Sequence, residues 1–89
     1  MSKQTPRTAA TRVLTQVLSK GQSLANVLPR ALEEIPPKDR ALAQELCYGT
    51  LRWLPRLETV LEQGLQHPLK AKDADVRALL LLGLYQLAY

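Results

Sequence analysis

Residues Lys38–Leu54 have the sequence K-D-R-A-L-A-Q-E-L-C-Y-G-T-L-R-W-L, and prolines mark both ends of this stretch. Pro36 and Pro37 precede it, and Pro55 follows it. Proline is favoured in the first turn of a helix and disfavours helical conformation at the residue before it. The stretch therefore predicts a helix over residues 37–53.

The apolar residues of this stretch recur every three or four positions, which places them on one broad stripe of a helix. The other segments of the chain are shorter or have a weaker pattern. We therefore expect this helix to be central and the other helices to pack around it. The stripe consists of Leu42, Ala43, Leu46, Cys47, Thr50, Trp53 and Leu54.

The composition favours a single all-α domain over residues 1–89. Leu and Ala dominate and Phe is absent, which favours helix over sheet. The longest apolar run, Ala78–Tyr85, is much shorter than the roughly 20 residues of a membrane span, and no apolar secretory signal follows Met1. One cysteine excludes an internal disulfide and fits a reducing compartment. We expect a cytoplasmic protein without a membrane partner.

Capping residues, glycines and prolines divide the rest of the chain. Thr5 is expected to cap the first helix, Gly21 to end it, and Ser23 to cap the second. Pro29 either kinks the second helix or marks a later start for it. A break is expected at residues 66–68. The expected helices span residues 6–20, 23–34, 37–53, 55–65 and 74–89.

The end of the last expected helix is apolar all round, with Gln86 as its only notable polar side chain. A helix of this kind has to be buried on all sides, but the four preceding amphipathic helices do not cover both of its sides. We therefore expect a fragment, truncated at its C-terminus, in which residues 78–89 are covered by further helices of a longer protein or by a dimer. One side holds Leu79, Leu80, Leu84 and Leu87, and the other holds Leu81, Leu82, Tyr85 and Tyr89.

Basic charge is concentrated at the N-terminal end of the chain. Residues 1–32 contain five basic and no acidic side chains, whereas residues 33–89 contain seven basic and eight acidic ones. Such an asymmetry favours a polyanionic partner, most commonly nucleic acid, although a solvated basic face is the alternative. Arg7 lies in the first turn of a helix, where the helix dipole disfavours a cation but free N–H groups suit a phosphate.

The residue types of catalysis do not form a recognisable site in this sequence. Cys47 lies on the apolar stripe without a partner base, so we expect it to pack in the core. His67 precedes a proline in a polar loop, and no second histidine is present to complete a metal site. Gly49 costs about 1 kcal/mol relative to Ala inside a helix, so we expect it to admit another helix. The aromatic residues have core spacing: Tyr48, Trp53, Tyr85 and Tyr89.

Two tracts of the chain resemble the N-terminal domain of the Sun/Fmu (RsmB) ribosomal RNA methyltransferases. They are D-R-A-L-A-Q-E-L-C-Y-G-T-L-R-W-L at residues 39–54 and L-L-G-L-Y-Q-L-A-Y at residues 81–89. The segments A-A-T-R-V-L-T-Q-V-L and S-L-A-N-V-L-P-R-A-L, at residues 9–18 and 23–32, fit the same pattern. The resemblance is closer to this family than to the related antitermination factor NusB. It implies a NusB-like fold of two small helical bundles, of which this chain covers about the first five helices.

The resemblance also implies a parent enzyme that transfers a methyl group from S-adenosylmethionine to C5 of a cytosine in small-subunit (16S) ribosomal RNA. The catalytic cysteines and cofactor pocket of that family lie in a C-terminal Rossmann-type domain, so Cys47 inherits no catalytic role and this chain is expected to hold no cofactor or metal. What carries over is contact of the basic N-terminal end with RNA, through Lys3, Arg7 and Arg12. Weaker candidates for RNA contact are Lys38, Arg40, Lys70 and Lys72. They lie in loops and at helix starts, where basic side chains are also favoured for solubility alone.

Three functions remain open at this point. The first is an RNA-binding domain that docks a methyltransferase on ribosomal RNA. The second is a protein-interaction module, either of the NusB antitermination type or packed on its own catalytic domain, for which residues 78–89 would matter most. The third is a small DNA-binding domain, which is disfavoured because no short recognition helix with base-reading side chains stands out.

Overall fold

The computed structural model describes residues 5–65 and 69–89, and over these residues it contains helices and no strands. The prediction of five α-helices is confirmed, with each end within one residue of its expected position. The break expected at 66–68, together with Lys3 and His67, lies outside the described residues. The helices are α1 (Pro6–Lys20), α2 (Leu24–Glu33), α3 (Pro37–Arg52), α4 (Leu54–Gly64) and α5 (Ala74–Ala88), and a 3₁₀ helix, η1 (Ala71–Asp73), precedes α5.

The ends of α1 follow the expected capping pattern. The hydroxyl of Thr5 accepts a hydrogen bond of 3.0 Å from the N–H of Thr8, and a proline occupies the first helical turn. Gly21 ends the helix with φ +67°, a left-handed conformation that costs glycine little. Ser23 stands at the N-cap of α2 as expected, but its hydroxyl makes no capping hydrogen bond.

Pro29 lies inside α2, so the alternative of a later helix start is wrong. Proline has no N–H, and the carbonyl of Ala25, four residues earlier, therefore lacks its usual intrahelical donor. Both residues are exposed, which leaves that carbonyl open to solvent. The helix accommodates the proline because it lies on the outer side.

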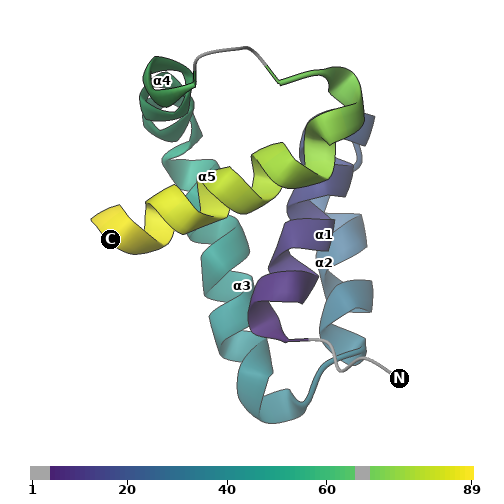
Figure 1. The fold of residues 1–89 in the computed structure, drawn as a ribbon. Coiled ribbons are helices and arrows are strands. Elements are labelled where there is room, and N and C mark those ends of the chain that lie inside the picture. Colours follow the sequence, from purple (N-terminus) through teal and green to yellow (C-terminus); the bar gives the residue numbers. More distant parts are fainter. Residues whose placement is uncertain (1–4, 66–68) are drawn as a thin grey trace.

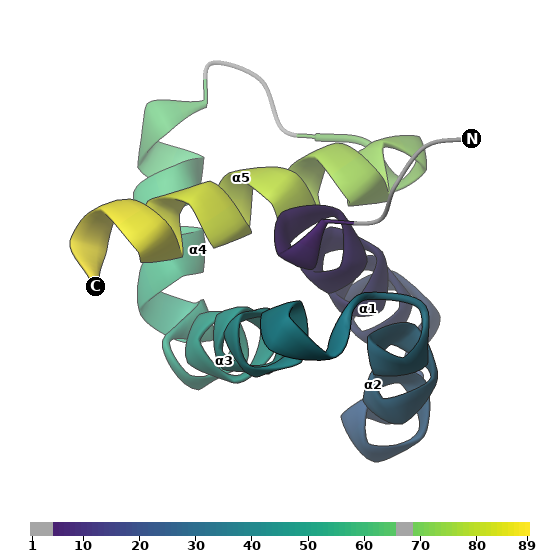
Figure 2. The ribbon, with the colours of Figure 1, turned by 90° about the horizontal axis from the view of Figure 1, so that it is seen from below.

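Figures 1 and 2 show α5 lying across α1 and α3, with α4 packed against α5 and with α2 beside α1. Helix α3 contacts all four other α-helices, as expected of the central helix. The main core forms where α1, α2, α3 and α5 meet. Its buried residues are Ala10, Val13, Leu14, Val27, Leu28, Leu46, Cys47, Ala78 and Leu82.

The predicted stripe of α3 is largely confirmed. Its middle is buried, whereas Trp53 and Leu54 at its end are half-buried. Leu42 is wrong as a core residue, because it lies at the edge of the stripe and is 48% exposed. Tyr48 and Tyr89 are also wrong as core residues, because they are 50% and 52% exposed.

A second cluster joins α4 to α5 through the buried residues Leu57, Leu61 and Leu81. The guanidinium of Arg77 on α5 reinforces this contact by donating a hydrogen bond of 2.6 Å to the carboxylate of Glu58 on α4. Val60 of α4 does not belong to this cluster and is 48% exposed.

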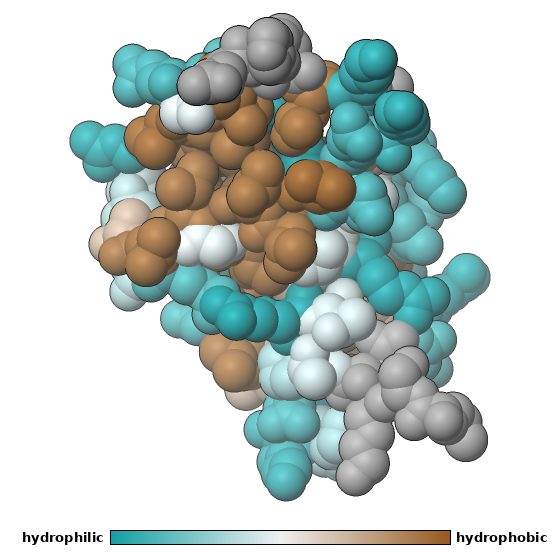
Figure 3. Space-filling view, in the orientation of Figure 1, coloured by the Kyte–Doolittle hydropathy of each residue, from teal (hydrophilic) through white to brown (hydrophobic). Residues whose placement is uncertain are grey.

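The two sides of α5 differ as the sequence indicates. Leu81 and Leu82 are fully buried, whereas Leu79 is 52% and Leu87 is 88% exposed. Figure 3 shows the resulting hydrophobic surface over α4 and α5. What covers this surface in a larger assembly remains a prediction.

Gly49 admits α5 close to the backbone of α3, as expected. A Cβ atom built on Gly49 would overlap the ring of Tyr85, coming within 2.6 Å of its Cε1 atom. Tyr85 also stacks on Tyr89 with ring centroids 5.6 Å apart, and Tyr89 stacks on Trp53 at 4.9 Å. The close approach at Gly49 therefore positions an aromatic row at the end of the chain.

We expect Gly49→Ala to lower the free energy of unfolding by about 1–3 kcal/mol, because overpacking outweighs the better helix propensity of alanine. Gly83→Ala is the matched control, since a Cβ atom at this α5 position meets nothing within 4 Å. It should raise the free energy of unfolding by about 0.5–1 kcal/mol. Urea unfolding followed by circular dichroism measures both, and equal effects would contradict the close packing at Gly49.

Candidate nucleic-acid interface

Arg7, the first predicted RNA contact among the described residues, is engaged within the fold. Its Nε and Nη2 atoms donate hydrogen bonds of 2.8 and 2.6 Å to Oε1 of Gln86, near the end of α5. Both side chains are exposed, so the remaining guanidinium donors still face solvent. Arg7 therefore links α1 to α5 and can also meet an anion.

The start of α1 offers fewer free N–H groups than the sequence suggested. Pro6 has none, the N–H of Thr8 is bonded to the Thr5 hydroxyl, and the N–H of Ala9 is bonded to the Thr5 carbonyl. The helix terminus alone is therefore a poor phosphate site, and phosphate binding in this region would depend on its arginines.

Arg12 is the second predicted contact, and it lies close to an acidic side chain. Its Nη1 atom is 4.0 Å from Oε2 of Glu34, and the two side chains are 60% and 62% exposed. Exposed pairs of this kind contribute about 0–1 kcal/mol, so the pair is easily broken. Arg12 remains available to a partner.

The other predicted contacts are not brought together. Lys38 and Arg40 lie in the first turn of α3, whereas Lys70 and Lys72 flank the start of η1 at the other end of the molecule (Figure 1). The lysines are exposed, but Arg40 is half-buried and donates a hydrogen bond of 3.3 Å to the Ile35 carbonyl. Arg40 therefore supports the turn between α2 and α3.

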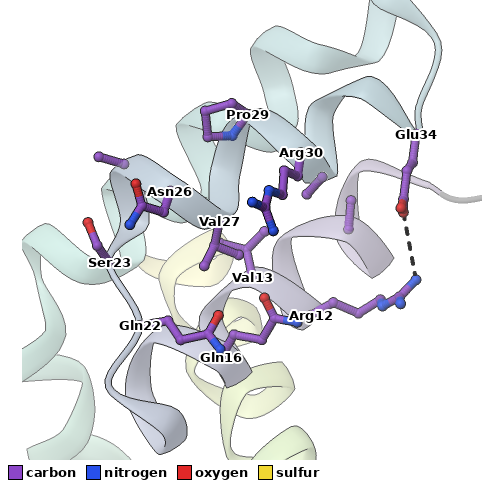
Figure 4. A pocket seen from close by; sticks show the side chains of 13 residues that line it. Arg12, Val13, Gln16, Gln22, Ser23, Asn26, Val27, Pro29, Arg30 and Glu34 are labelled. Carbon is purple, nitrogen blue, oxygen red and sulfur yellow. Dashed lines mark ion pairs between the residues drawn. The ribbon is translucent and has the colours of Figure 1, made fainter.

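Helices α1 and α2 line an open groove of about 970 Å³ at the basic end. Figure 4 shows Arg30 extending from α2 over this groove, and Arg12 extending from α1 towards Glu34. Small apolar side chains, among them the buried Ala9 and Val13, form part of its lining. Its polar side chains are Arg12, Gln16, Gln22, Ser23, Asn26, Arg30 and Glu34.

Arg30 and the amide side chains were not among the sequence-predicted site residues, although a signal for them exists. Arg12 and Gln16 are four residues apart on α1, and Asn26 and Arg30 are four residues apart on α2. Residues at this spacing share one helix face. Because a three-residue connection at Gly21 joins the two helices, these faces meet in one groove.

Cys47 packs in the core as expected. It is fully buried, its Sγ atom is 4.0 Å from the Ala10 carbonyl, and burial raises the pKa of its thiol to about 12. A nucleophilic cysteine needs a lowered pKa and access to substrate. The environment of Cys47 provides neither.

We expect Cys47 to react with iodoacetamide only after unfolding, since the folded chain keeps the thiol protonated and covered. At mildly alkaline pH the folded chain should label far more slowly than the same chain in concentrated urea, as measured by mass spectrometry. Labelling of the folded chain at the rate of the unfolded one would contradict the core assignment.

The described residues lack two other kinds of site. They contain no group of three or more His, Cys, Asp or Glu side chains that could hold a metal ion. None of the described helices is both long and apolar enough to cross a membrane.

Comparison with known proteins identifies matches over almost the whole chain. The model of the NusB family matches residues 4–89. The chain is 55% identical over 84 residues to ribosomal RNA small subunit methyltransferase B of Pseudomonas putida, an alignment covering 94% of this chain and 19% of that protein. The proteins of the same name in Vibrio vulnificus and Proteus mirabilis are 49% and 47% identical over 83 residues, covering 93% of this chain and 20% of each relative.

The chain therefore spans about a fifth of the length of the curated relatives that it matches. The matched part is their N-terminal region. The resemblance of the sequence to the NusB-like domain of ribosomal RNA methyltransferases is confirmed.

Proposed function

The chain belongs to the NusB family, and we propose that it is the RNA-binding domain that docks a longer small-subunit ribosomal RNA methyltransferase on its substrate. The proposal is supported by the relatives, which are named as ribosomal RNA methyltransferases at about 50% identity. These names favour a methyltransferase domain over an antitermination factor or a DNA-binding domain. RNA contact of this chain is our inference.

The distribution of charge is the observation that carries the proposal. The first 32 residues contain no acidic side chain. Arg7, Arg12 and Lys20 lie on α1 and Arg30 lies on α2, so the fold gathers the described cations of this segment on one helical hairpin. All four are exposed. Cations on one surface attract the phosphate backbone of RNA and orient it.

Methyl transfer is a proposal for the longer protein. S-adenosylmethionine would supply the methyl group for C5 of a cytosine. The described residues contain no strand and therefore no strand–loop–helix unit of a Rossmann-type domain. They do not fit this cofactor, so its pocket would lie in a further domain. We place the protein in the cytoplasm, where its free thiol stays reduced.

The hydrophobic surface of α4 and α5 supports a second role, which is contact with protein. A hollow of about 530 Å³ lies on this surface between Val60, Leu84 and Leu87. Large contiguous apolar surfaces commonly mark interaction sites. We propose that the remaining four-fifths of the longer protein, including its catalytic domain, covers this surface, and that the isolated chain can dimerise through residues 78–89.

We expect the 89-residue chain to bind small-subunit ribosomal RNA hairpins with an affinity that falls as salt rises. Replacing Arg7 and Arg12 together by Gln should weaken binding and flatten the salt slope by roughly 0.7–0.9 for each phosphate that the variant no longer neutralises. Fluorescence titration at several salt concentrations measures both quantities.

The matched control replaces Arg52 and Arg56 by Gln, which removes the same charge from exposed positions outside the basic hairpin. This variant should keep the wild-type salt slope apart from a small general charge effect. If both variants lose the same amount of RNA affinity, or if the wild type binds no RNA, the basic end is a solvated face. Binding of a duplex DNA of the same length with the same affinity as the RNA would exclude RNA selectivity.

We expect replacement of Leu79 and Leu87 by Gln to abolish concentration-dependent self-association of the isolated chain, because both side chains are more than half exposed on the apolar surface. Sedimentation velocity over a range of concentrations measures the association. The control is Leu42→Gln, which removes an exposed leucine from α3. A wild-type chain that stays monomeric at its highest soluble concentration would exclude the dimer.

A further inference from the structure

We propose that the α1–α2 groove binds unpaired nucleotides of an RNA, with arginines contacting phosphates and amide side chains contacting base edges. The arginines are Arg12 and Arg30, and the amides are Gln16, Gln22 and Asn26. This inference rests on the proposed RNA-binding function and deepens it, because it assigns both the site and the single-stranded form of the ligand.

The size of the groove suits a small number of nucleotides. Its volume of about 970 Å³ is at the upper end of the range of roughly 300–1,000 Å³ that is usual for ligand pockets. Two guanidinium groups and one carboxylate line it, so cations outnumber anions. Both arginines are exposed and can adjust to a flexible strand.

The hydrogen-bonding groups of the lining favour bases over a purely anionic ligand. An amide side chain has both donors and an acceptor, as do the edges of unpaired bases. An acidic side chain would present carboxylate acceptors only, so it would use the NH₂ donors of the three amides and leave their carbonyl oxygens unpaired. Sequence-specific RNA recognition targets single strands whose bases are splayed out and hydrogen-bonded, with arginine guanidinium planes available for stacking.

Glu34 makes the arrangement testable with substitutions of opposite effect. It lies at one end of the groove, 4.0 Å from Arg12, and repels a phosphate that approaches that arginine. Removing its charge should strengthen phosphate binding, whereas removing the charge of Arg30 should weaken it. A nonspecific charge effect predicts the same signs, so the control must carry an equal change elsewhere.

The experiment titrates the 89-residue chain with a single-stranded RNA and with its duplex at fixed salt, and compares short homopolymers of cytidine, uridine and adenosine. Arg30→Gln should weaken single-strand binding about tenfold, the size of one charge-assisted hydrogen bond, while the control Arg52→Gln changes it less than twofold. Glu34→Gln should tighten binding severalfold, and Glu62→Gln, an exposed α4 position, should not.

The amides are tested by the double variant Gln16→Ala and Asn26→Ala. If they contact base edges, the affinity ratios among the three homopolymers should move towards one while the salt slope stays unchanged. Thermal unfolding by circular dichroism confirms that each variant is folded. A duplex that binds as tightly as the single strand, or homopolymer ratios unaffected by the double variant, would overturn base contact in the groove.

Failure of this inference can be distinguished from failure of the proposed function. If the wild type binds RNA with a strong salt dependence but Arg30→Gln and Glu34→Gln behave like their controls, RNA binding stands and the groove is not its site. If no RNA binds at any salt concentration, both proposals fail. Binding of polyglutamate that depends on Arg30 and excludes RNA would assign the groove to an acidic protein segment instead.

Discussion

The packing of α5 across α3 at Gly49 is the constraint on which the rest of the structure depends. Because Gly49 has no side chain, the ring of Tyr85 lies against the backbone of α3. Gln86 on the same helix, and Tyr89 directly after it, then reach further partners. Gln86 accepts the hydrogen bonds from Arg7 at the start of α1, and Tyr89 stacks at the α3–α4 junction. The last two turns of α5 therefore join three other helices.

This arrangement separates an apolar surface from a basic one. The inner side of α5 is buried in the core. Its outer side forms the hydrophobic surface together with α4 (Figure 3). The α1–α2 hairpin carries the described cations of residues 1–32, and all of them are exposed. Arg7 serves the fold as well as the surface, whereas Arg12 and Arg30 are free of the core. The domain can therefore contact a polyanion and a protein at different places.

Helix ends could be predicted from the sequence because their causes are local. Thr5, the proline after it and Gly21 act within a few residues. Leu42 was misplaced because it lies at the edge of an apolar stripe, where burial depends on whether another helix covers that edge. The partner of Arg7 is 79 residues away, and no periodicity within α1 reveals it. Such pairings require the tertiary arrangement.

The α1–α2 groove shows why a charge count finds the binding end of a chain without finding its site. The count gives residues 1–32 five equivalent cations. A solvated face would need only those charges, yet here Gln16 follows Arg12 and Asn26 precedes Arg30 at a spacing of four, on faces that meet. Groups suited to phosphate and groups suited to base edges therefore line the same groove. An unpaired RNA strand presents both phosphates and base edges, and solubility alone gives no reason for this combination.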